Sequence, residues 1–119
     1  MKKKYNGWKW ISVKRRFQIY LRDQHTCQYC SVHRDEYGVI MSLDHISSQL
    51  VYKKRWGWIK DHSNENLVTC CLDCNIRKDE ASVQDFTPRA GEILAQAKKP
   101  LPDSVISLSY RYTKQQPLF

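Results

Sequence analysis

Two pairs of cysteines have the spacing of a metal site. The pairs are Cys27-x2-Cys30 and Cys71-x2-Cys74, with 40 residues between them. Each pair can present two thiolates to one ion, and tetrahedral zinc takes four such ligands. Disulfides and free buried thiols are the alternatives, but paired spacing in a chain expected to stay reduced favours zinc. Four cysteines leave no coordination position for water, so we predict a structural zinc.

A fifth cysteine, Cys70, is adjacent to Cys71 and makes the choice of ligand ambiguous. Cys71 gives the x2 spacing, whereas Cys70 would give x3. On a strand, alternate residues share a face, so Cys70 would lie on the same face as Val68. We therefore assign Cys70 to the core as a small apolar side chain.

Four polar residues near the cysteines form a candidate catalytic set: Asp44, His45, Asn66 and Asn75. Hydrolysis of a phosphodiester needs an activated water and a cation on the phosphate. Histidine can take a proton from water near neutral pH, and carboxylate and amide oxygens can hold a hard divalent ion. Each residue alone is better explained by a turn, a helix cap or a buried histidine. Their combination in a basic chain favours hydrolysis.

Two short strands and a helix are predicted to position this set. The first strand, over 39–43, runs straight into the Asp-His pair, and the second covers 67–70. A helix should follow from about residue 72 or 74 to 81, and it would carry Asn75.

A further helix is predicted before the first cysteine pair, over 13–22, with Ser12 as its N-cap. Its apolar residues fall on one face, which we expect to pack against the core, with the basic residues largely elsewhere. The stripe consists of Val13, Phe17, Tyr20 and Leu21.

The C-terminal part should contain one more helix, with Thr87 as N-cap and Pro88 at its first position, ending near Lys98. The sequence also allows a strand over 105–112. The segment 46–63 is predicted to be a long polar connection with a basic, aromatic centre.

The charge distribution points to an acidic partner. The chain of 119 residues has a formal charge of +8 and a pI of about 9.4, and nucleic acid is the commonest partner of such proteins. The alternative is a solvated basic tail. Residues 1–11 are predicted to form a basic, aromatic arm. Eight cations precede the first acid, Asp23: Lys2, Lys3, Lys4, Lys9, Lys14, Arg15, Arg16 and Arg22.

The expected localisation follows from segments that are not recognisable in the sequence, and the expected domain number follows from length and composition. No secretory signal is recognisable, and no segment approaches the roughly 20 apolar residues of a membrane span, so we expect a cytoplasmic protein. The length and a hydrophobic content of 41% favour one small folded domain.

Three stretches carry the most specific patterns. They are Arg22-Asp23-x-x-Thr26-Cys27-x-Tyr29-Cys30, Leu43-Asp44-His45-Ile46 and Asn66-Leu67-Val68-Thr69-x-Cys71-x-x-Cys74-Asn75-x-x-Lys78. In combination they resemble the HNH endonuclease family in its zinc-stabilised form, over roughly residues 15–80. The resemblance implies an α+β fold, the small ββα-metal (His-Me finger) fold, beside two zinc knuckles. The expected single domain has a core over about 15–82, the arm, and a C-terminal helix and tail over 87–119.

The resemblance also implies roles for the catalytic set. His45 resembles the general base, Asp44 a ligand of the catalytic metal, and Asn66 the residue that positions the base and its loop. Asn75 occupies the third motif position, where the family name has histidine, so the chain resembles the HNN variants. Because Asp44 and Asn75 would both offer oxygen, we expect Mg²⁺ or Mn²⁺ rather than a metal that prefers imidazole.

Contacts to nucleic acid are expected at two places. Arg77 and Lys78 could reach phosphates from the helix after the second cysteine pair, although a solvated helix face is the alternative. The basic residues of the long connection could bind the backbone while neighbouring aromatics stack on bases, or could cap the small core. These residues are Lys53, Lys54 and Arg55. His62 follows Asp61 and is close to Asn66 in the sequence, so it is expected in a surface loop, with a minor role in the site as the alternative.

The function that these observations favour is a metal-dependent endonuclease acting on DNA, most simply double-stranded DNA. The resemblance implies products with 5′-phosphate and 3′-hydroxyl ends. The alternative is a non-catalytic, zinc-dependent nucleic-acid-binding module, and a zinc-stabilised protein-interaction domain is a third possibility. Sequence specificity and oligomeric state stay open.

Overall fold

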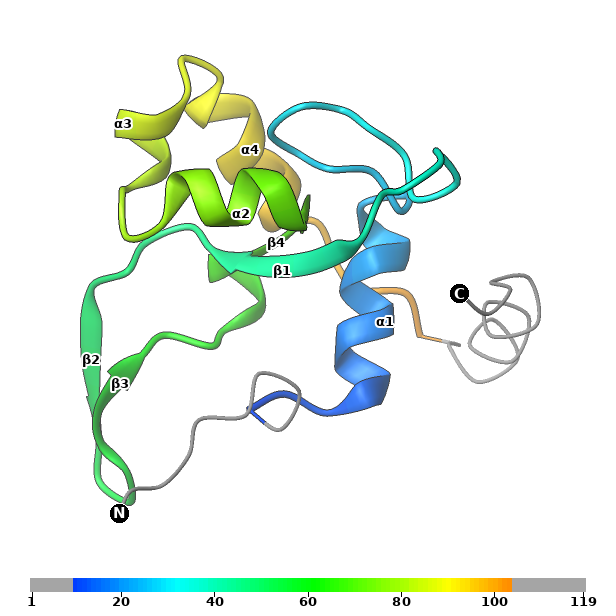
Figure 1. Cartoon of the computed structure of the whole chain (residues 1–119). Helices are drawn as coiled ribbons and strands as arrows, with labels where there is room; N and C mark the ends of the chain where they lie inside the picture. The colour runs from blue at the N-terminus through cyan, green and yellow to red at the C-terminus, as the bar shows by residue number, and fades with distance from the viewer. Residues whose placement is uncertain (1–9, 104–119) are drawn as a thin grey trace.

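The two strands that flank the candidate set pair with each other. The computed structural model of the chain describes residues 10–103, and in it β1 (Met41–His45) and β4 (Leu67–Cys71) form a two-stranded antiparallel sheet (Figure 1). His45 lies opposite Leu67, and Met41 lies opposite Cys71. The second strand is confirmed, whereas the first begins two residues later than predicted. The Asp-His pair therefore belongs to β1 instead of following it.

Helix α2 (Leu72–Lys78) starts directly after β4 and packs on β1 (Figure 1). Its N-cap is Cys71, whose sulfur accepts a hydrogen bond from the amide of Cys74. The predicted start is confirmed, but the helix ends at Lys78 and not at 81. Asp79 adopts a φ of 51° there, a left-handed conformation that ends helices.

Helix α1 (Val13–Arg22) has the predicted bounds and the predicted cap. The Ser12 side chain accepts a hydrogen bond from the amide of Arg15 at 3.1 Å. The predicted packing face is wrong at its first residue, because Val13 is 57% exposed. Arg16 is buried instead, with its guanidinium 3.2 Å from the Tyr20 hydroxyl. The helix therefore packs along the face that contains Ile19, which is fully buried.

A buried ion pair joins the end of α1 to the sheet. The Arg22 Nε lies 2.8 Å from Asp23 Oδ1, and both side chains are almost fully buried. Arg22 Nη2 donates to the Leu67 carbonyl at 2.6 Å, while Asp23 Oδ2 accepts from the amide of Thr69 at 2.9 Å. Arg22 thus acts inside the molecule and does not extend the basic arm.

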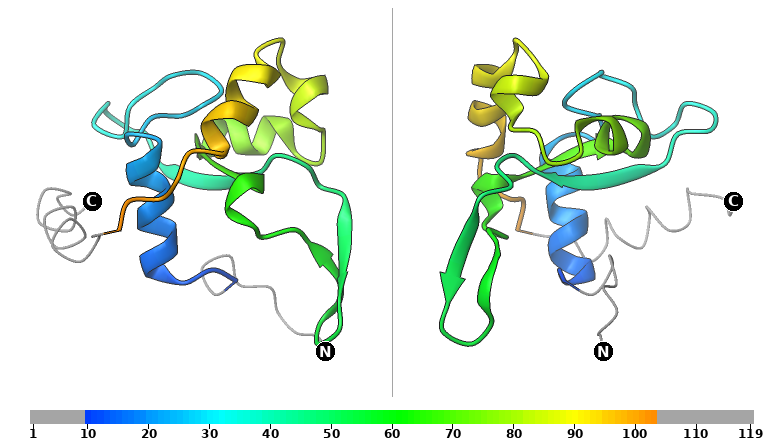
Figure 2. Two further views of the ribbon diagram at one scale, coloured as in Figure 1. Left: turned by 180° about the vertical axis from the view of Figure 1, so that it is seen from behind. Right: turned by 60° about the vertical axis from the view of Figure 1, so that its left-hand side comes forward.

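The C-terminal part contains two helices where one was predicted. They are α3 (Val83–Phe86) and α4 (Ala90–Ala97), and Figure 2 shows α4 beside the sheet, in agreement with its contacts to β4. The predicted N-cap is wrong, because Thr87 closes α3 by donating its amide to the Val83 carbonyl. The following turn delays α4 to Ala90.

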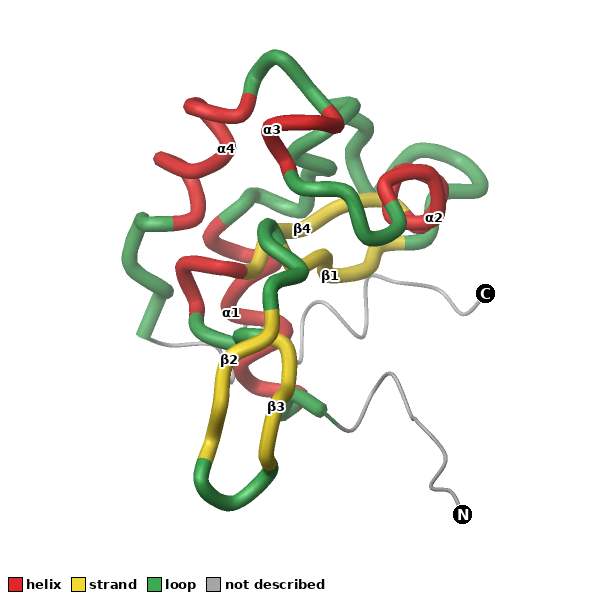
Figure 3. Tube along the Cα trace, turned by 90° about the vertical axis from the view of Figure 1, so that its left-hand side faces the viewer, coloured by secondary structure: helices red, strands yellow, loops and turns green. Residues whose placement is uncertain are grey.

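The predicted polar connection contains a β-hairpin. Strands β2 (Leu50–Lys53) and β3 (Gly57–Lys60) pair antiparallel, and the hairpin extends away from the sheet and helices (Figures 1 and 3). In its three-residue loop, the amide of Trp56 donates to the Lys53 carbonyl at 3.0 Å. Gly57 then has a φ of +79°, the left-handed position that this type of hairpin loop requires.

The core has two parts, one around the cysteines and one under α1. Ile11 belongs to the second part, so the predicted arm joins the fold at its last residues. Residues 1–9 of the arm and the predicted strand over 105–112 lie outside the described residues. Within residues 10–103, no helix is long and apolar enough to cross a membrane. The first part includes Cys27, Tyr29, Ile46, Val68, Cys70, Val83 and Ile93, and the second Ile11, Ile19, Tyr20, Leu43 and Leu67.

Candidate functional site

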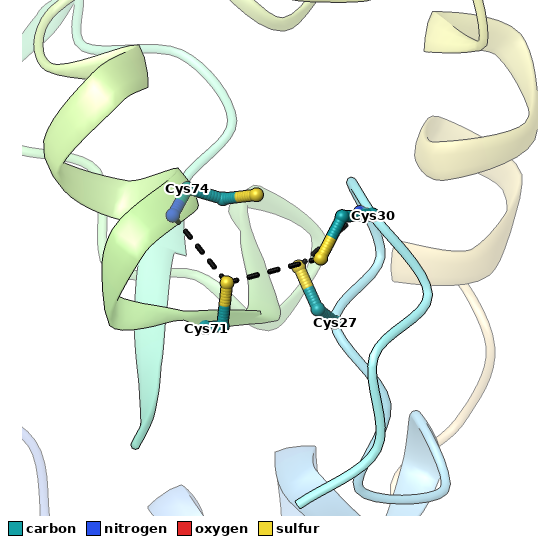
Figure 4. Close-up of side chains that lie close together, drawn as sticks. All are labelled: Cys27, Cys30, Cys71 and Cys74. Atoms are coloured by element: carbon teal, nitrogen blue, oxygen red, sulfur yellow. Dashed lines mark hydrogen bonds between the residues drawn. The ribbon is translucent and has the colours of Figure 1, made fainter. Parts of the chain in front are cut away.

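The four paired cysteines meet at one point. Cys27 and Cys30 come from the loop after α1, and Cys71 and Cys74 from the junction of β4 and α2 (Figure 4). Their sulfurs all lie within 4.8 Å of one another, and the Cys30 and Cys71 sulfurs are 3.8 Å apart. Zinc–sulfur bonds of about 2.3 Å in a tetrahedron place sulfurs about 3.8 Å apart. The cluster could therefore hold a structural metal such as zinc.

The surroundings of the cluster suit thiolate ligands. The amides of Tyr29 and Cys30 both point at the Cys27 sulfur at 3.4 Å, and the Arg77 guanidinium lies 3.4 Å from the Cys74 sulfur. Burial raises the pKa of the Cys27 thiol, but backbone N–H donors outweigh it and the pKa is lowered overall. Such donors offset the negative charge of four thiolates around one ion.

Cys70 lies in the core, as predicted. It is fully buried in the apolar cluster, and burial raises the pKa of its thiol well above the usual value. Its sulfur lies 3.8 Å from the Ser42 hydroxyl across the sheet. Cys71, one residue on, is the ligand candidate because its sulfur belongs to the four-sulfur cluster.

Asp44 is buried and already has two partners. Its Oδ2 accepts a hydrogen bond from the Tyr29 hydroxyl at 2.6 Å and lies 2.9 Å from the Lys78 ammonium. Burial raises the pKa of the Asp44 carboxyl, and these two donors oppose the shift. Lys78 is 2% exposed and also donates to the His45 carbonyl. Sequence reasoning put Lys78 on a phosphate-contacting helix face, but the structure turns its ammonium inward.

Asn75 ties α2 to the neighbouring strand. Its amide nitrogen donates to the Ser42 hydroxyl at 2.6 Å and to the Leu43 carbonyl at 3.2 Å. Both contacts use the nitrogen, which leaves the amide oxygen for another partner. Asp44, His45 and Asn75 line the same open pocket of about 840 Å³.

Asn66 is nearly buried and bridges two loops. Its side chain accepts from the amide of Ser47 at 2.9 Å and donates to the carbonyls of Ser47 and Asp61, at 3.1 and 2.8 Å. Ser47 lies two residues after His45, and Asp61 directly precedes His62. One asparagine therefore fixes the distance between the segments that carry the two histidines.

His45 and His62 contact each other, which sequence reasoning did not foresee. The His45 Nε2 is 2.9 Å from the His62 Nδ1, and the Trp10 ring lies against both imidazoles, with centroids 5.0 and 4.6 Å away. His62 was expected in a surface loop and Trp10 in the arm. The available signal was weak: a histidine between an aspartate and Asn66.

The environment keeps His45 uncharged at neutral pH. Burial is the main cause, and the positive charges of Lys60 and Lys78 add to it, so the pKa of His45 falls to about 4. Burial likewise lowers the pKa of His62. At pH 7 the pair is therefore two neutral rings that share one hydrogen bond.

The remaining basic candidates lie at the surface. Lys53, Lys54 and Arg55 form the tip of the hairpin and line a second open pocket of about 820 Å³, together with Arg15. Arg77 is exposed and pairs with Asp73 one helical turn earlier.

Comparisons of the chain with profiles of known protein families, with curated proteins and with solved structures gave no match. The chemistry of the site has to be inferred from its own geometry.

Proposed function

We propose that this protein is a metal-dependent endonuclease of the HNH type, which hydrolyses phosphodiester bonds in DNA. The observation that carries the proposal is a neutral histidine, His45, in one pocket with the side chains of Asp44 and Asn75. The basic charge of the chain supports a polyanionic substrate, and the choice of DNA rests on the sequence resemblance.

His45 is suited to accept a proton from water. Because its pKa is near 4, the ring is neutral at pH 7 and keeps one unprotonated nitrogen, but it is a weaker base than a histidine with the usual pKa. The hydrogen bond to His62 involves Nε2, which leaves Nδ1 for the water. This role requires His45 to carry its proton on Nε2 and to donate it to His62.

Asp44 and Asn75 would hold the catalytic ion. Asp44 uses Oδ2 for Tyr29 and Lys78, and Asn75 uses its nitrogen, so each residue keeps one oxygen for a metal. Two protein oxygens, completed by water and phosphate, are a ligand set that Mg²⁺ accepts. A bound ion of this kind would stabilise charge on the phosphate. Asn66 would keep the loop of His45 in place.

The test is nicking of supercoiled plasmid with added Mg²⁺ or Mn²⁺ and without added metal. The His45→Ala variant should lose about 10²-fold or more in rate, because general-base catalysis contributes about 10²- to 10⁴-fold. His33→Ala removes a histidine outside the pocket and should nick like wild type. Equal nicking by His45→Ala and wild type would show that His45 is not the base.

A non-catalytic nucleic-acid-binding module is the second candidate. It is favoured by the ion pair between Lys78 and Asp44, which already neutralises the carboxylate proposed as a metal ligand. The same assay separates the two functions when double-stranded DNA, single-stranded DNA and RNA are all tried. Binding without cleavage of any substrate would support the module.

A further inference from the structure

One face of the hairpin exposes large aromatic side chains. Tyr52 and Trp58 are opposite each other in the register of β2 and β3, with ring centroids 5.5 Å apart, and are 60% and 67% exposed. Leu50 lies on the same face and is 49% exposed. The opposite face carries Val51 and Ile59, which are half-buried. The more aromatic face of this hairpin is therefore the one that points to solvent.

The same hairpin is uniformly basic. Residues 50–60 include Lys53, Lys54, Arg55 and Lys60 and no acid. At the tip, the Arg55 guanidinium lies 4.9 Å from the ring centroid of Trp56, which is 65% exposed. Exposed rings among cations complement a polyanion that also has flat apolar groups.

The hairpin leads directly to the candidate catalytic pocket. Ile59 and Lys60, at the end of β3, line that pocket together with His45. Ile59 and His62 line both this pocket and the second pocket beside the basic tip. The base of the hairpin therefore borders the candidate catalytic pocket, where Ile59 lies on the face opposite Tyr52 and Trp58.

We propose that the hairpin over 50–60 binds unpaired nucleotides next to the cleavage site. Tyr52, Trp58 and Trp56 stack on bases, and the tip cations contact phosphates. Stacking needs a free base face, which a continuous duplex hides, so the preferred substrate contains a single-stranded stretch. The link to cleavage rests on the proposed nuclease function, whereas the binding preference is independent of it.

A purely structural role makes a different prediction. A cross-strand aromatic pair can stabilise a two-stranded hairpin, which is marginal by itself. Removing Trp58 would then lower the melting temperature and leave affinity unchanged. Trp56 lies in the loop, outside the paired register, so its removal spares the paired strands.

The experiment measures binding of fluorescent oligonucleotides by anisotropy. The ligands are a single strand, a continuous duplex and a duplex with a single-stranded gap, and the buffer contains neither Mg²⁺ nor chelator, so that bound zinc is retained. The variants are Trp58→Val and Trp56→Ala. Tyr37→Ala is the matched control, because Tyr37 is fully exposed and lies outside the hairpin.

We expect each hairpin variant to lose about tenfold in affinity for the single strand and the gapped duplex, and less than about twofold for the continuous duplex. Tyr37→Ala should bind like wild type. Equal losses on all ligands, unchanged affinity in both variants, or no oligonucleotide binding by wild type would overturn the proposal. Hairpin-dependent binding to phosphatidylserine vesicles without oligonucleotide binding would also overturn it and would indicate a membrane surface.

The nicking assay separates this proposal from the nuclease proposal. Hairpin-dependent binding without nicking would reject the nuclease alone. Nicking with hairpin-independent binding would reject the present inference alone.

Discussion

The contact between His45 and His62 suggests that His62 orients the His45 ring. One proton lies between His45 Nε2 and His62 Nδ1. If that proton is bound to His45 Nε2, then Nδ1 of His45 is the nitrogen that can accept a second proton. Trp10 lies against both rings and limits their motion. If His45 acts as the proposed base, His62 is the residue that would orient it.

Replacing His62 should therefore change turnover without changing substrate binding. We expect His62→Ala to lower kcat for nicking about tenfold with KM nearly unchanged, because His45 loses its orienting partner. His62→Asn can offer an oxygen near the former Nδ1 and should recover part of the rate. Steady-state nicking kinetics of the two variants test this. A rise in KM with unchanged kcat would indicate a substrate contact instead.

Loss of the buried ion pair between Arg22 and Asp23 should lower the free energy of unfolding far more than loss of an exposed ion pair. Asp23→Ala leaves the Arg22 guanidinium buried without its carboxylate, which typically costs about 3–5 kcal/mol. Urea unfolding measures the loss. Glu92→Ala is the control, because it breaks an exposed pair with Arg89 and should cost less than about 1 kcal/mol. Similar losses in the two variants would contradict this account.

Among the elements, the cysteine cluster joins two segments that lie far apart in the sequence. It links the loop after α1 to the start of α2, across the segment that holds β1 and the hairpin. A small domain often depends on such a metal for its fold. A bound ion would then help to hold α2, and with it Asn75, in place.

Loss of one ligand should show this dependence. We expect Cys27→Ser to lower bound zinc well below one equivalent and to abolish the cooperative thermal transition. Cys70→Ala removes a cysteine that is not a ligand and should keep one zinc, with a moderate fall in melting temperature from the small cavity. Metal analysis with thermal melting distinguishes them. Full zinc content in Cys27→Ser would show that the cluster is not the metal site.

Local signals predicted several elements well. Ser12 has its side chain on the first turn of α1, so the cap and the helix bounds could be predicted from residue type and spacing. The cysteine spacing likewise indicated the cluster, because two short knuckles need no knowledge of the chain between them.

Non-local contacts explain what the sequence could not predict. The hairpin could not be predicted because its aromatic residues face solvent, whereas the aromatic residues of a strand usually face the core. The burial of Arg22 depends on carbonyls that come from β4 and α4, far along the chain. The contact of His62 with His45 depends on two loops that Asn66 holds together.

At the scale of the whole molecule, the formal charge overstates the positive surface. Arg16, Arg22 and Lys78 are buried, and the last two form ion pairs inside the fold. Among the described residues there are two runs of three consecutive cations, 14–16 and 53–55, and only the run at the hairpin tip is exposed throughout. If the protein binds nucleic acid, the fall in affinity with rising salt should therefore come largely from the cations of this tip.

A metal ion bound by the four cysteines would close a loop of 40 residues, so the assembly of that loop would depend on the supply of the metal. Asp44, His45 and Asn66 all lie in the segment that a bound ion would close. An ion that binds the folded chain alone stabilises it by mass action, by about 1.4 kcal/mol for each tenfold rise in free zinc above the dissociation constant. The fraction of chains with an assembled pocket would then follow the zinc available to the cell, and a change in metal homeostasis would act as a change in the concentration of folded protein.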